Sequence, residues 1–514
     1  MVRMAPMTFP IMQQLDIAVH YFYVPNRLLF DSSADWEAFI SPQATAKNPN
    51  PRETTPPTYD LNPNTEFGLP QQFFKEGELL DFLGYNKYDN ADVTKSLLAH
   101  ILPVNAYNLI YYNYYMDQNV SDSPNMKKIL GKPGLHDPSS DGSDLSAQGE
   151  SLQKYFSLRN RCWKKDYFTS SLPFTQRGAD VHLPLYGKMP IKNYAGSIGI
   201  QSTSTPSENS NFQVNYNPSN NKLKFGSNNQ YEINQTLNLN QLSGALYGDL
   251  TNATAATINE LRKATALQRF LEISARCGSR YKEFVLGHFG VDVPDGRLQR
   301  PEFLGGGTCK MQISEVLQTS SSVTSEGGDV TSPLADMAGH GIAFGKTNYC
   351  KKSFPEHGYV MAIMSIIPRA GYYQGVRKDL LKQDRLDFYS PEFAHLGEQP
   401  IELAEIFTGG NADEYDPHST FGYTPRYAEY KFIPNQIHGT FKTNMDAWHM
   451  ARKFDTAPTL SKEFMEVNEY ANGLNRVFAV PGTNQSPIEH FYVYAFNDVR
   501  ALRPMPVFGT PSII

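Results

Sequence analysis

The stretch from Glu356 to Ile406 constrains the fold of this chain more than any other. A strand-like apolar run at Tyr359–Ile367 leads into a long irregular segment that is dense in aromatic, charged, glycine and proline residues. This segment is too aromatic for a floppy linker and too irregular for a helix or a sheet. It must therefore fold over a surface, and a second copy of the same chain offers the simplest one. The pattern is typical of an assembly protein rather than of an enzyme with a cleft.

Strand signals sit at both ends of the chain and point to a β-sandwich. Residues 17–24 and 488–496 alternate with apolar or aromatic side chains on both faces, as central strands do. The chain has 30 Tyr, 31 Phe, 37 Gly and 35 Pro, which favours strands joined by structured loops. Well-separated strands with long connections predict a Greek-key or jelly-roll sandwich, in which first and last strands can meet in one sheet. Further strands are expected at Lys310–Val316, Tyr359–Ile367, Tyr427–Phe432, Ile437–Phe441 and Arg476–Val480.

Helices and one insertion interrupt this pattern. A capping box at Thr257 begins a helix that ends near Cys277 and Gly278, and its apolar residues 258, 261, 267 and 271 fall near one face. A second helix is expected over 280–288, with Tyr281, Phe284 and Val285 facing inward, and a third over 107–117. Residues 187–250 are rich in Asn, Ser, Gln and Thr and predict a polar insertion with short hairpins. We expect one domain over 1–514 with this insertion projecting from it.

Several functional classes are disfavoured. The net charge of −6 argues against a dedicated nucleic-acid binder, although it leaves room for a local basic patch. The four cysteines form no metal-binding or disulfide pattern and are expected to be free and buried. The sequence shows neither a signal peptide nor an apolar run near the roughly 20 residues of a membrane span, which predicts a protein made in a cytoplasm.

The chain carries no catalytic motif in a suitable setting, so no enzymatic activity and no cofactor is expected. The run Gly305–Lys310 has the wrong spacing for a phosphate loop, and a turn that brings backbone close to a neighbour explains its glycines better. The histidines lack metal-ligand spacing. The pair Glu402/Glu405 and the cluster 413–416 fit solvated loop charge, and the cluster retains cation binding as an alternative.

One segment combines cations with rings as a single-stranded nucleic acid requires. Between residues 159 and 168, four cations interleave with three aromatics. Cations meet phosphates while rings stack on unpaired bases. The alternative is a solvated edge whose aromatics turn inward. The candidate DNA-binding residues are Arg159, Arg161, Trp163, Lys164 and Lys165.

The irregular segment supplies candidate contacts between copies. Its basic run at 377–385 is interspersed with Asp379, Asp384 and Asp387, which favours ion pairs between subunits over DNA contact. Aromatic and arginine side chains dominate interface energetics, and packing within the chain is the alternative. The candidate subunit-interface residues are Tyr372, Tyr373, Arg377, Phe388, Tyr389 and Phe393.

Distinctive sequence motifs occur in order along nearly the whole chain. Together they resemble the major capsid proteins of the Microviridae, and especially those of the gokushovirus group of small single-stranded DNA phages. The motifs include VRMAPMTFPIM and YFYVPNRLLF near the start, LPVNAYNLIYYNYYMDQN at 102–119, KKDYFTSSLPFTQRG at 164–178, ATINELRKATALQRFLEISARCGSRYKEFVLGHFGV at 256–291, PDGRLQRPEFLGGG at 294–307, EHGYVMAI, YYQGVRKD, DFYSPEFAHLGEQP, FGYTPRYAEYKFIPNQIHG, DAWHMARKF and DVRALRPMP.

The resemblance implies an all-β, eight-stranded antiparallel jelly roll with long loop insertions and a few short helices. It implies self-assembly into a T=1 icosahedral shell around circular single-stranded DNA, within a virion assembled in the cytoplasm of a bacterial host. The implied partners are other copies of the chain, the packaged DNA, a small basic DNA-binding virion protein, a minor or pilot virion protein and a host receptor, but no membrane. In the family a large insertion forms a protrusion proposed to meet the host, which makes 187–250 its candidate here.

Family members usually carry an additional stretch before the VRMAPM motif, which here starts at the first residue, so no role of that arm is carried over. A host-receptor-binding spike protein of a virion is the main alternative, but it would usually carry trimeric or fibrous repeats. A secreted carbohydrate-active sandwich would carry a signal peptide.

Overall fold

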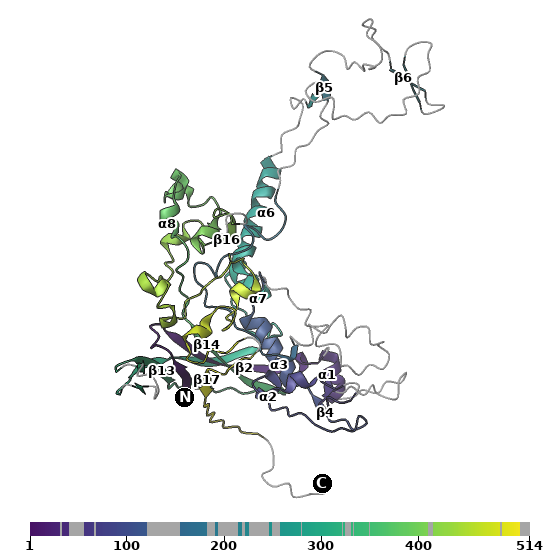
Figure 1. Cartoon of the computed structure of the whole chain (residues 1–514). Helices are drawn as coiled ribbons and strands as arrows, with labels where there is room; N and C mark the ends of the chain where they lie inside the picture. The colour runs from purple at the N-terminus through teal and green to yellow at the C-terminus, as the bar shows by residue number, and fades with distance from the viewer. Residues whose placement is uncertain are drawn as a thin grey trace, which may run out of the picture. The chain divides into compact units, whose positions relative to one another are not determined.

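The computed structural model contains two compact units (Figure 1). One comprises Met1–Arg177 and Ile273–Ile514, and the other comprises Gly178–Glu272. The described residues are 1–30, 33–40, 56–65, 68–120, 155–181, 191–193, 214–217, 222–225, 246–248, 258–278, 280–320, 322–323, 330–332, 334–348, 350–409, 415–483 and 486–503.

The first unit is built on a three-stranded antiparallel sheet in the order β14-β2-β9. β2 and β14 pair along their whole length, from Leu15 opposite Pro368 to Pro25 opposite Gly358. The strands predicted over 17–24 and 359–367 are therefore confirmed, and the first of them is central, as its two apolar faces indicated. The three strands are β2 (Leu15–Pro25), β9 (Glu302–Lys310) and β14 (Gly358–Pro368).

A second, four-stranded sheet has the order β10-β13-β1-β17. β1 lies between two partners, so that Val2 faces Ala343 on one side and Val493 on the other. The sequence analysis did not predict β1, and the C-terminal strand predicted over 488–496 is shorter. The strand predicted at 310–316 corresponds to the end of β9 and most of β10. The strands are β1 (Val2–Met7), β10 (Gln312–Leu317), β13 (Met337–Ala343) and β17 (Phe491–Val493).

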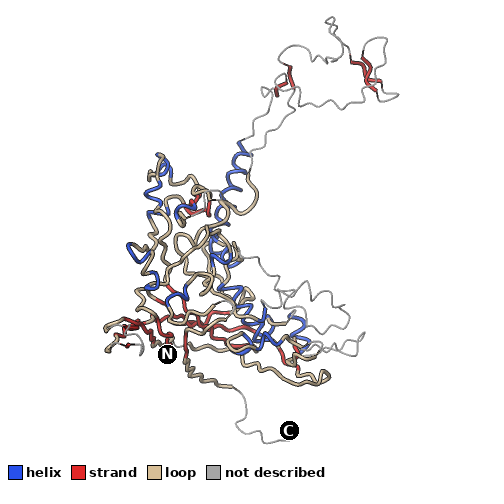
Figure 2. Tube along the Cα trace, viewed as in Figure 1, coloured by secondary structure: helices blue, strands red, loops and turns tan. Residues whose placement is uncertain are grey.

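One apolar core gathers side chains from both sheets. Leu15 of β2 and Val477 from a distant turn are both fully buried in it. In Figure 2 the strands of these two sheets lie close together near the N-terminus, and long loop segments run beside them. Burial of apolar area is the main stabilising term here, at about 25 cal/mol per Å². The cluster consists of Val2, Met4, Ala5, Met7, Ile11, Leu15, Ile17, Trp163, Met311, Ala343, Ile367, Met450, Leu474, Val477 and Phe478.

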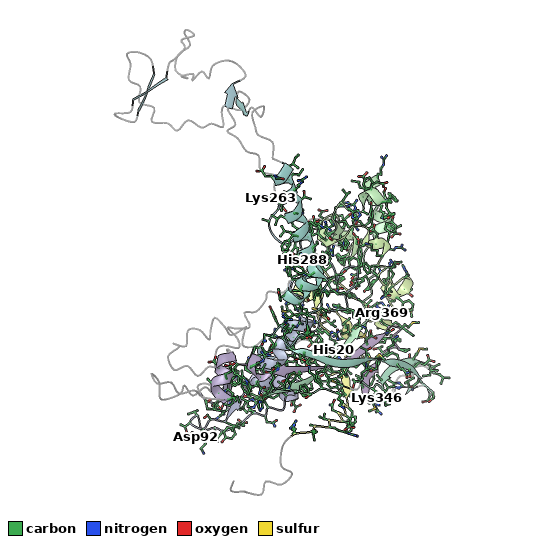
Figure 3. All side chains as sticks on the ribbon, turned by 180° about the vertical axis from the view of Figure 1, so that it is seen from behind. His20, Asp92, Lys263, His288, Lys346 and Arg369 are labelled. Atoms are coloured by element: carbon green, nitrogen blue, oxygen red, sulfur yellow. The ribbon has the colours of Figure 1, made fainter. Side chains whose placement is uncertain are left out.

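The helix predicted over 107–117 is present but begins earlier. It consists of α3 (Leu102–Ile110) followed directly by a π-helical turn, Tyr111–Tyr115. A proline in its first turn suits a helix start, because proline lacks an N–H and the N–H groups of a first turn have no hydrogen-bond partner within the helix. The helix packs on β2, where His20, labelled in Figure 3, hydrogen-bonds the Tyr115 hydroxyl at 2.7 Å. Burial, together with the nearby Arg161 cation, lowers the pKa of His20.

The two predicted helices after residue 257 are confirmed as α6 (Ile258–Cys277) and α7 (Tyr281–Phe289). Gly278, directly after α6, has φ +103°, and Gly290 caps α7 with φ +69°. The capping residue predicted at 257 lies outside the described residues. The inward placement predicted for Tyr281 is wrong, because its ring is exposed.

Three segments predicted as strands contain 3-10 helical turns instead. The chain enters each turn through a residue in the left-handed region: Tyr427 (φ +61°), Gly439 (φ +67°) and Gly473 (φ +61°). At Tyr427 and Gly439 such a residue turns the backbone inside the predicted strand and interrupts it. The third strand, predicted from Arg476, begins within the turn Leu474–Val477 instead. The turns are Ala428–Tyr430, Gly439–Lys442 and Leu474–Val477.

The glycine run at 305–307 lies inside β9 rather than in a turn. Gly305 has φ +133° and sits at a bulge opposite Tyr21. A Cβ on Gly306 would lie 2.4 Å from the carbonyl oxygen of Val19. The predicted close approach of backbone is therefore present, and the predicted turn is wrong.

The remaining strands form antiparallel pairs, so the prediction of an antiparallel, strand-rich fold with a few short helices is confirmed for the described residues. In the first unit these are β3 (Thr58–Asp60) with β4 (Leu98–His100), β11 (Ser322–Val323) with β12 (Val330–Ser332), and β15 (Glu398–Glu402) with β16 (Thr420–Pro425). In the second they are β5 (Ile191–Asn193) with β8 (Leu246–Gly248) and β6 (Val214–Asn217) with β7 (Lys222–Phe225). The other helical elements are α1 (Ser33–Ile40), α2 (Leu79–Phe82), α8 (Lys378–Leu381), α9 (Lys462–Met465) and short turns at Asn26–Leu28, Gln71–Phe74, Arg385–Asp387, Pro391–Phe393, Leu403–Glu405 and Asp446–Trp448.

Candidate assembly and DNA-binding surfaces

The segment predicted to bind DNA begins with two arginines that turn toward α3 and its π-helical turn. The guanidinium carbon of Arg159 lies 5.3 Å from the centre of the Tyr111 ring. Arg161 donates a hydrogen bond to the Ser365 hydroxyl on β14 at 2.6 Å and lies 5.2 Å from the centre of the Tyr115 ring. Burial lowers the pKa of the Arg161 guanidinium. The guanidinium groups of Arg159 and Arg161 thus both make contacts within the chain.

Trp163 is buried beneath this segment and does not offer a face for base stacking. The guanidinium of the buried Arg452 lies 5.1 Å from its ring centre and 3.8 Å from the centre of the Phe464 ring. Arg452 also donates a hydrogen bond to the carbonyl oxygen of Phe464 at 2.6 Å. Cation–π contacts and this hydrogen bond hold the charge in the core.

Lys164 and Lys165 present their charges to solvent, since the side chain of each is more than half exposed. Lys164 pairs with Asp16 and Lys165 with Asp117. Burial alone would raise the pKa of the Asp16 carboxyl, but the hydrogen bond and charge of Lys164 lower it below its usual value. Of the five predicted DNA-binding residues, only these two lysines combine a cation with high exposure.

Among the predicted interface residues, the two adjacent tyrosines pack within the chain. The Tyr372 ring is 6% exposed and lies 4.7 Å from the centre of the Phe168 ring, and its hydroxyl donates to Asp166 Oδ2 at 2.8 Å. Burial raises the pKa of the Tyr372 hydroxyl. Tyr373 is half-buried against His449, with ring centres 5.6 Å apart. Packing within the chain, the alternative interpretation, describes Tyr372.

The other four lie toward the surface. Arg377 is exposed and donates two hydrogen bonds to the carboxylate of Asp379, at 2.9 and 2.8 Å. Phe388 and Tyr389 are 55% and 60% exposed, and Phe393 is half-buried. These residues remain available to a neighbouring copy.

Phe388 and Tyr389 form a continuous patch with a ring that the sequence analysis missed. Tyr430 lies 6.1 Å from Tyr389, centre to centre. The Lys382 ammonium lies between the rings, 4.0 Å from the centre of Tyr430 and 5.8 Å from that of Phe388. We call the three exposed rings of Phe388, Tyr389 and Tyr430 the assembly patch; the side chain of Lys382 itself is only 3% exposed. Tyr430 was missed because its segment was interpreted as a strand.

Ion pairs within the chain hold the irregular segment in its folded shape. The Lys378 ammonium lies 2.8 Å from Glu402 and 3.5 Å from Glu405, and Lys382 lies 2.9 Å from Glu429. Burial raises the pKa of Glu405. Glu402 is also partly buried, but its hydrogen bonds with Lys378 and His418 lower its pKa below the usual value.

The acids predicted to pair between subunits have partners within the chain. Asp379 pairs with Arg377, and Asp384 and Asp387 cap the 3-10 turn that begins at Arg385. The basic run therefore stabilises the fold of its own segment, and pairing of these three carboxylates between subunits stays a prediction.

No described group of three His, Cys, Asp or Glu side chains is placed to hold a metal ion. Residues 413 and 414 of the acidic cluster lie outside the described residues, and Glu402 and Glu405 are engaged with Lys378. All four cysteines are free; three are half-buried and Cys350 is exposed, so the prediction that all are buried is wrong for Cys350. The described helices include none with both the length and the apolar character of a membrane span.

A strand-rich antiparallel fold, wrapped in ordered segments that leave rings exposed, suits a structural protein that assembles through its surface. The model of the family described as capsid protein (F protein) matches residues 1–513, and the chain belongs to this family. Its function is that of a major capsid protein, a component of a virion that forms a shell by self-assembly.

Three relatives support the same conclusion over 99% of this chain. The capsid protein VP1 of Bdellovibrio phage phiMH2K is 33% identical over 524 residues, which cover 88% of that protein. The capsid proteins VP1 of Chlamydia phage 1 and Spiroplasma virus 4 are each 29% identical, over 89% and 88% of their lengths. All three are Microviridae, which confirms the resemblance, and the spike-protein alternative is not favoured.

Proposed function

We propose that copies of this chain close into a T=1 icosahedral shell around a circular single-stranded DNA genome, with an eight-stranded jelly roll as the building unit. The four-stranded and three-stranded antiparallel sheets that share one core support the jelly roll. Each head-to-tail contact joins different surfaces of two copies, and such contacts end in a closed shell only when successive rotations return to the start.

The exposure of the assembly patch is the observation that carries this proposal. Phe388 and Tyr389 belong to the irregular segment, which the ion pair of Lys382 with Glu429 and the buried Tyr372 anchor, so these two rings are held in place before any partner arrives. Ordered, exposed rings lose little conformational freedom when they are covered, and covering them stabilises association. Arg377 and Phe393 are proposed as further contacts between copies.

The DNA-contacting role is proposed for Lys164 and Lys165. Both are ion-paired with carboxylates of their own chain, so their contribution to phosphate binding is modest. The net charge of −6 likewise indicates that the shell protein does not condense DNA alone. A small basic virion protein would share that task, and a minor or pilot protein would complete the particle, which forms in the host cytoplasm.

The polar segment 187–250 is proposed as a surface protrusion that meets a host receptor, carried by a single capsid domain. β5 and β8 support this arrangement, because Ile191 pairs with Gly248 and brings the two ends of the segment together. A segment with joined ends can be inserted between two neighbouring positions of a fold without separating them.

Electron cryomicroscopy of the purified protein, over a range of concentrations, tests the shell proposal. Closed icosahedral particles with a jelly roll in each subunit are expected. Monomers at every concentration, or fibres, would contradict it.

A further inference from the structure

The residues that follow β17 form an extended, exposed segment, which we call the C-terminal arm (494–503). Its large apolar side chains are Tyr494, Phe496, Val499 and Leu502, with exposed fractions of 67%, 78%, 80% and 103%. The sequence analysis missed this exposure, because the strand that it predicted over 488–496 placed the first residues of the arm in a sheet. β17 in fact ends at Val493.

Few contacts hold the arm to its own chain. The backbone of Tyr494 pairs with Met1, and the Tyr21 hydroxyl donates to Asn497 Oδ1 at 2.9 Å. Beyond Asn497, the one polar contact given by the described residues is within the arm, between Arg500 and Asp498 at 3.3 Å. Hydrogen bonds to the rest of the chain thus hold the arm at Tyr494 and Asn497. Its large apolar side chains are exposed along its whole length.

The chemistry of the arm favours a protein surface over nucleic acid. Val499 and Leu502 have no ring to stack on a base, and aliphatic side chains gain most from a dry apolar partner. Asp498 repels phosphate and pairs with Arg500, which leaves Arg503 as the arm's unpaired cation among the described residues. Such a segment suits a groove or an exposed strand edge on another protein.

The identity of that protein follows from the family. A capsid protein functions among many copies of itself, so the surface present in greatest supply around each arm is that of a second copy. The arm also continues directly from β17, the edge strand of the four-stranded sheet, so that its backbone leaves the fold at a free edge.

We propose that the C-terminal arm reaches across to a second copy of this chain and packs Phe496, Val499 and Leu502 against it, as a strap between neighbouring subunits. This inference rests on the proposed shell. It adds a contact that is separate from the assembly patch and made by extended backbone rather than by a folded loop.

Isotope-mixed cross-linking tests the strap directly. Shells are assembled from equal amounts of ¹⁴N- and ¹⁵N-labelled chains that carry photoreactive benzoylphenylalanine in place of Phe496, and cross-linked peptides are identified by mass spectrometry. Mixed-isotope peptides are expected. Peptides of a single isotope throughout would place the arm on its own chain, and cross-links to DNA in filled particles would assign it to the genome; either result overturns the proposal. A failure to form shells with the unmodified chain would instead contradict the proposed function.

A triple variant measures the contribution of the strap. Phe496→Ser, Val499→Ser and Leu502→Ser together should raise the protein concentration needed for half-assembly by at least about tenfold, because three apolar contacts per subunit are lost. The urea midpoint of the unassembled chain should not change, since these side chains are exposed in it. The matched control, Ala495→Ser with Ala501→Ser, should assemble as the wild type does. Wild-type assembly by the triple variant would refute the strap.

Discussion

Two rings from the same irregular segment should respond to truncation in opposite ways. Phe388→Ala removes a ring that is 55% exposed, so it should leave the stability of the monomer almost unchanged. A phenylalanine buries about 200 Å² when covered, so about 110 Å² of this ring is available to a neighbour. At about 25 cal/mol per Å², full coverage would contribute about 2.8 kcal/mol to each contact, or about a hundredfold in the association constant.

Tyr372→Ala should do the reverse. It removes a ring that is 6% exposed, leaves a cavity beside Phe168 and takes the hydroxyl donor away from Asp166. Truncation of a buried aromatic costs about 3–5 kcal/mol of folding free energy. The variant should therefore unfold at a lower urea concentration, and its assembly should fall only as far as its folded fraction does.

Urea unfolding followed by tryptophan fluorescence measures the folding stability of the monomer. Light scattering against protein concentration measures shell assembly. The assignment of Phe388 to a subunit contact fails if Phe388→Ala forms shells at the wild-type concentration. The assignment of Tyr372 to the core fails if Tyr372→Ala is as stable as the wild type.

Three further perturbations test other parts of the structure. Lys164→Gln with Lys165→Gln should weaken genome retention and reduce its dependence on salt, whereas the exposed pair Lys431→Gln with Lys442→Gln should not; equal retention at all salt concentrations would remove the two lysines from the DNA-binding proposal. Gly306→Ala should destabilise the unassembled chain by more than about 2 kcal/mol in urea unfolding, because its Cβ meets the Val19 carbonyl oxygen at 2.4 Å, and wild-type stability would disprove the close approach. The pKa of Glu402 is lowered in the folded chain, so its ionised form stabilises the fold at pH values above its ordinary pKa of 4.5. This contribution to stability is lost as the pH falls through the lower pKa of the folded state. The stability difference between wild type and Glu402→Gln should therefore be largest near neutral pH and shrink in acid; a difference that grows in acid would contradict this sign.

The parts of the fold that could be predicted are those in which one periodicity dominates. The alternation in β2 and β14 and the capped, apolar-faced pattern of α6 each exclude other structures locally. β1 escaped prediction because its six residues include a proline and acquire their strand character from pairing on both sides. The alternation at 427–432 indicated a strand, but Tyr427 adopts a left-handed conformation that sequence pattern does not reveal.

The candidate sites were predicted less completely, for a different physical reason. A sequence shows that cations and rings alternate, but it does not show whether an arginine meets a ring of its own chain or a base. Arg159 and Arg161 lie over tyrosine rings of the helix that packs on β2, and that neighbour is some fifty residues away in sequence. The exposed rings at 388 and 389 were identified because the segment around them is too irregular for a regular element to cover them.

The pairing of β1 with β17 has a consequence for how the protein is made. Residue 2 cannot find its partner at residue 493 until that residue has emerged from the ribosome. Contacts so distant in sequence also form slowly. The four-stranded sheet therefore stays incomplete until β17 has been synthesised, which delays the appearance of assembly-competent molecules to a late stage of translation.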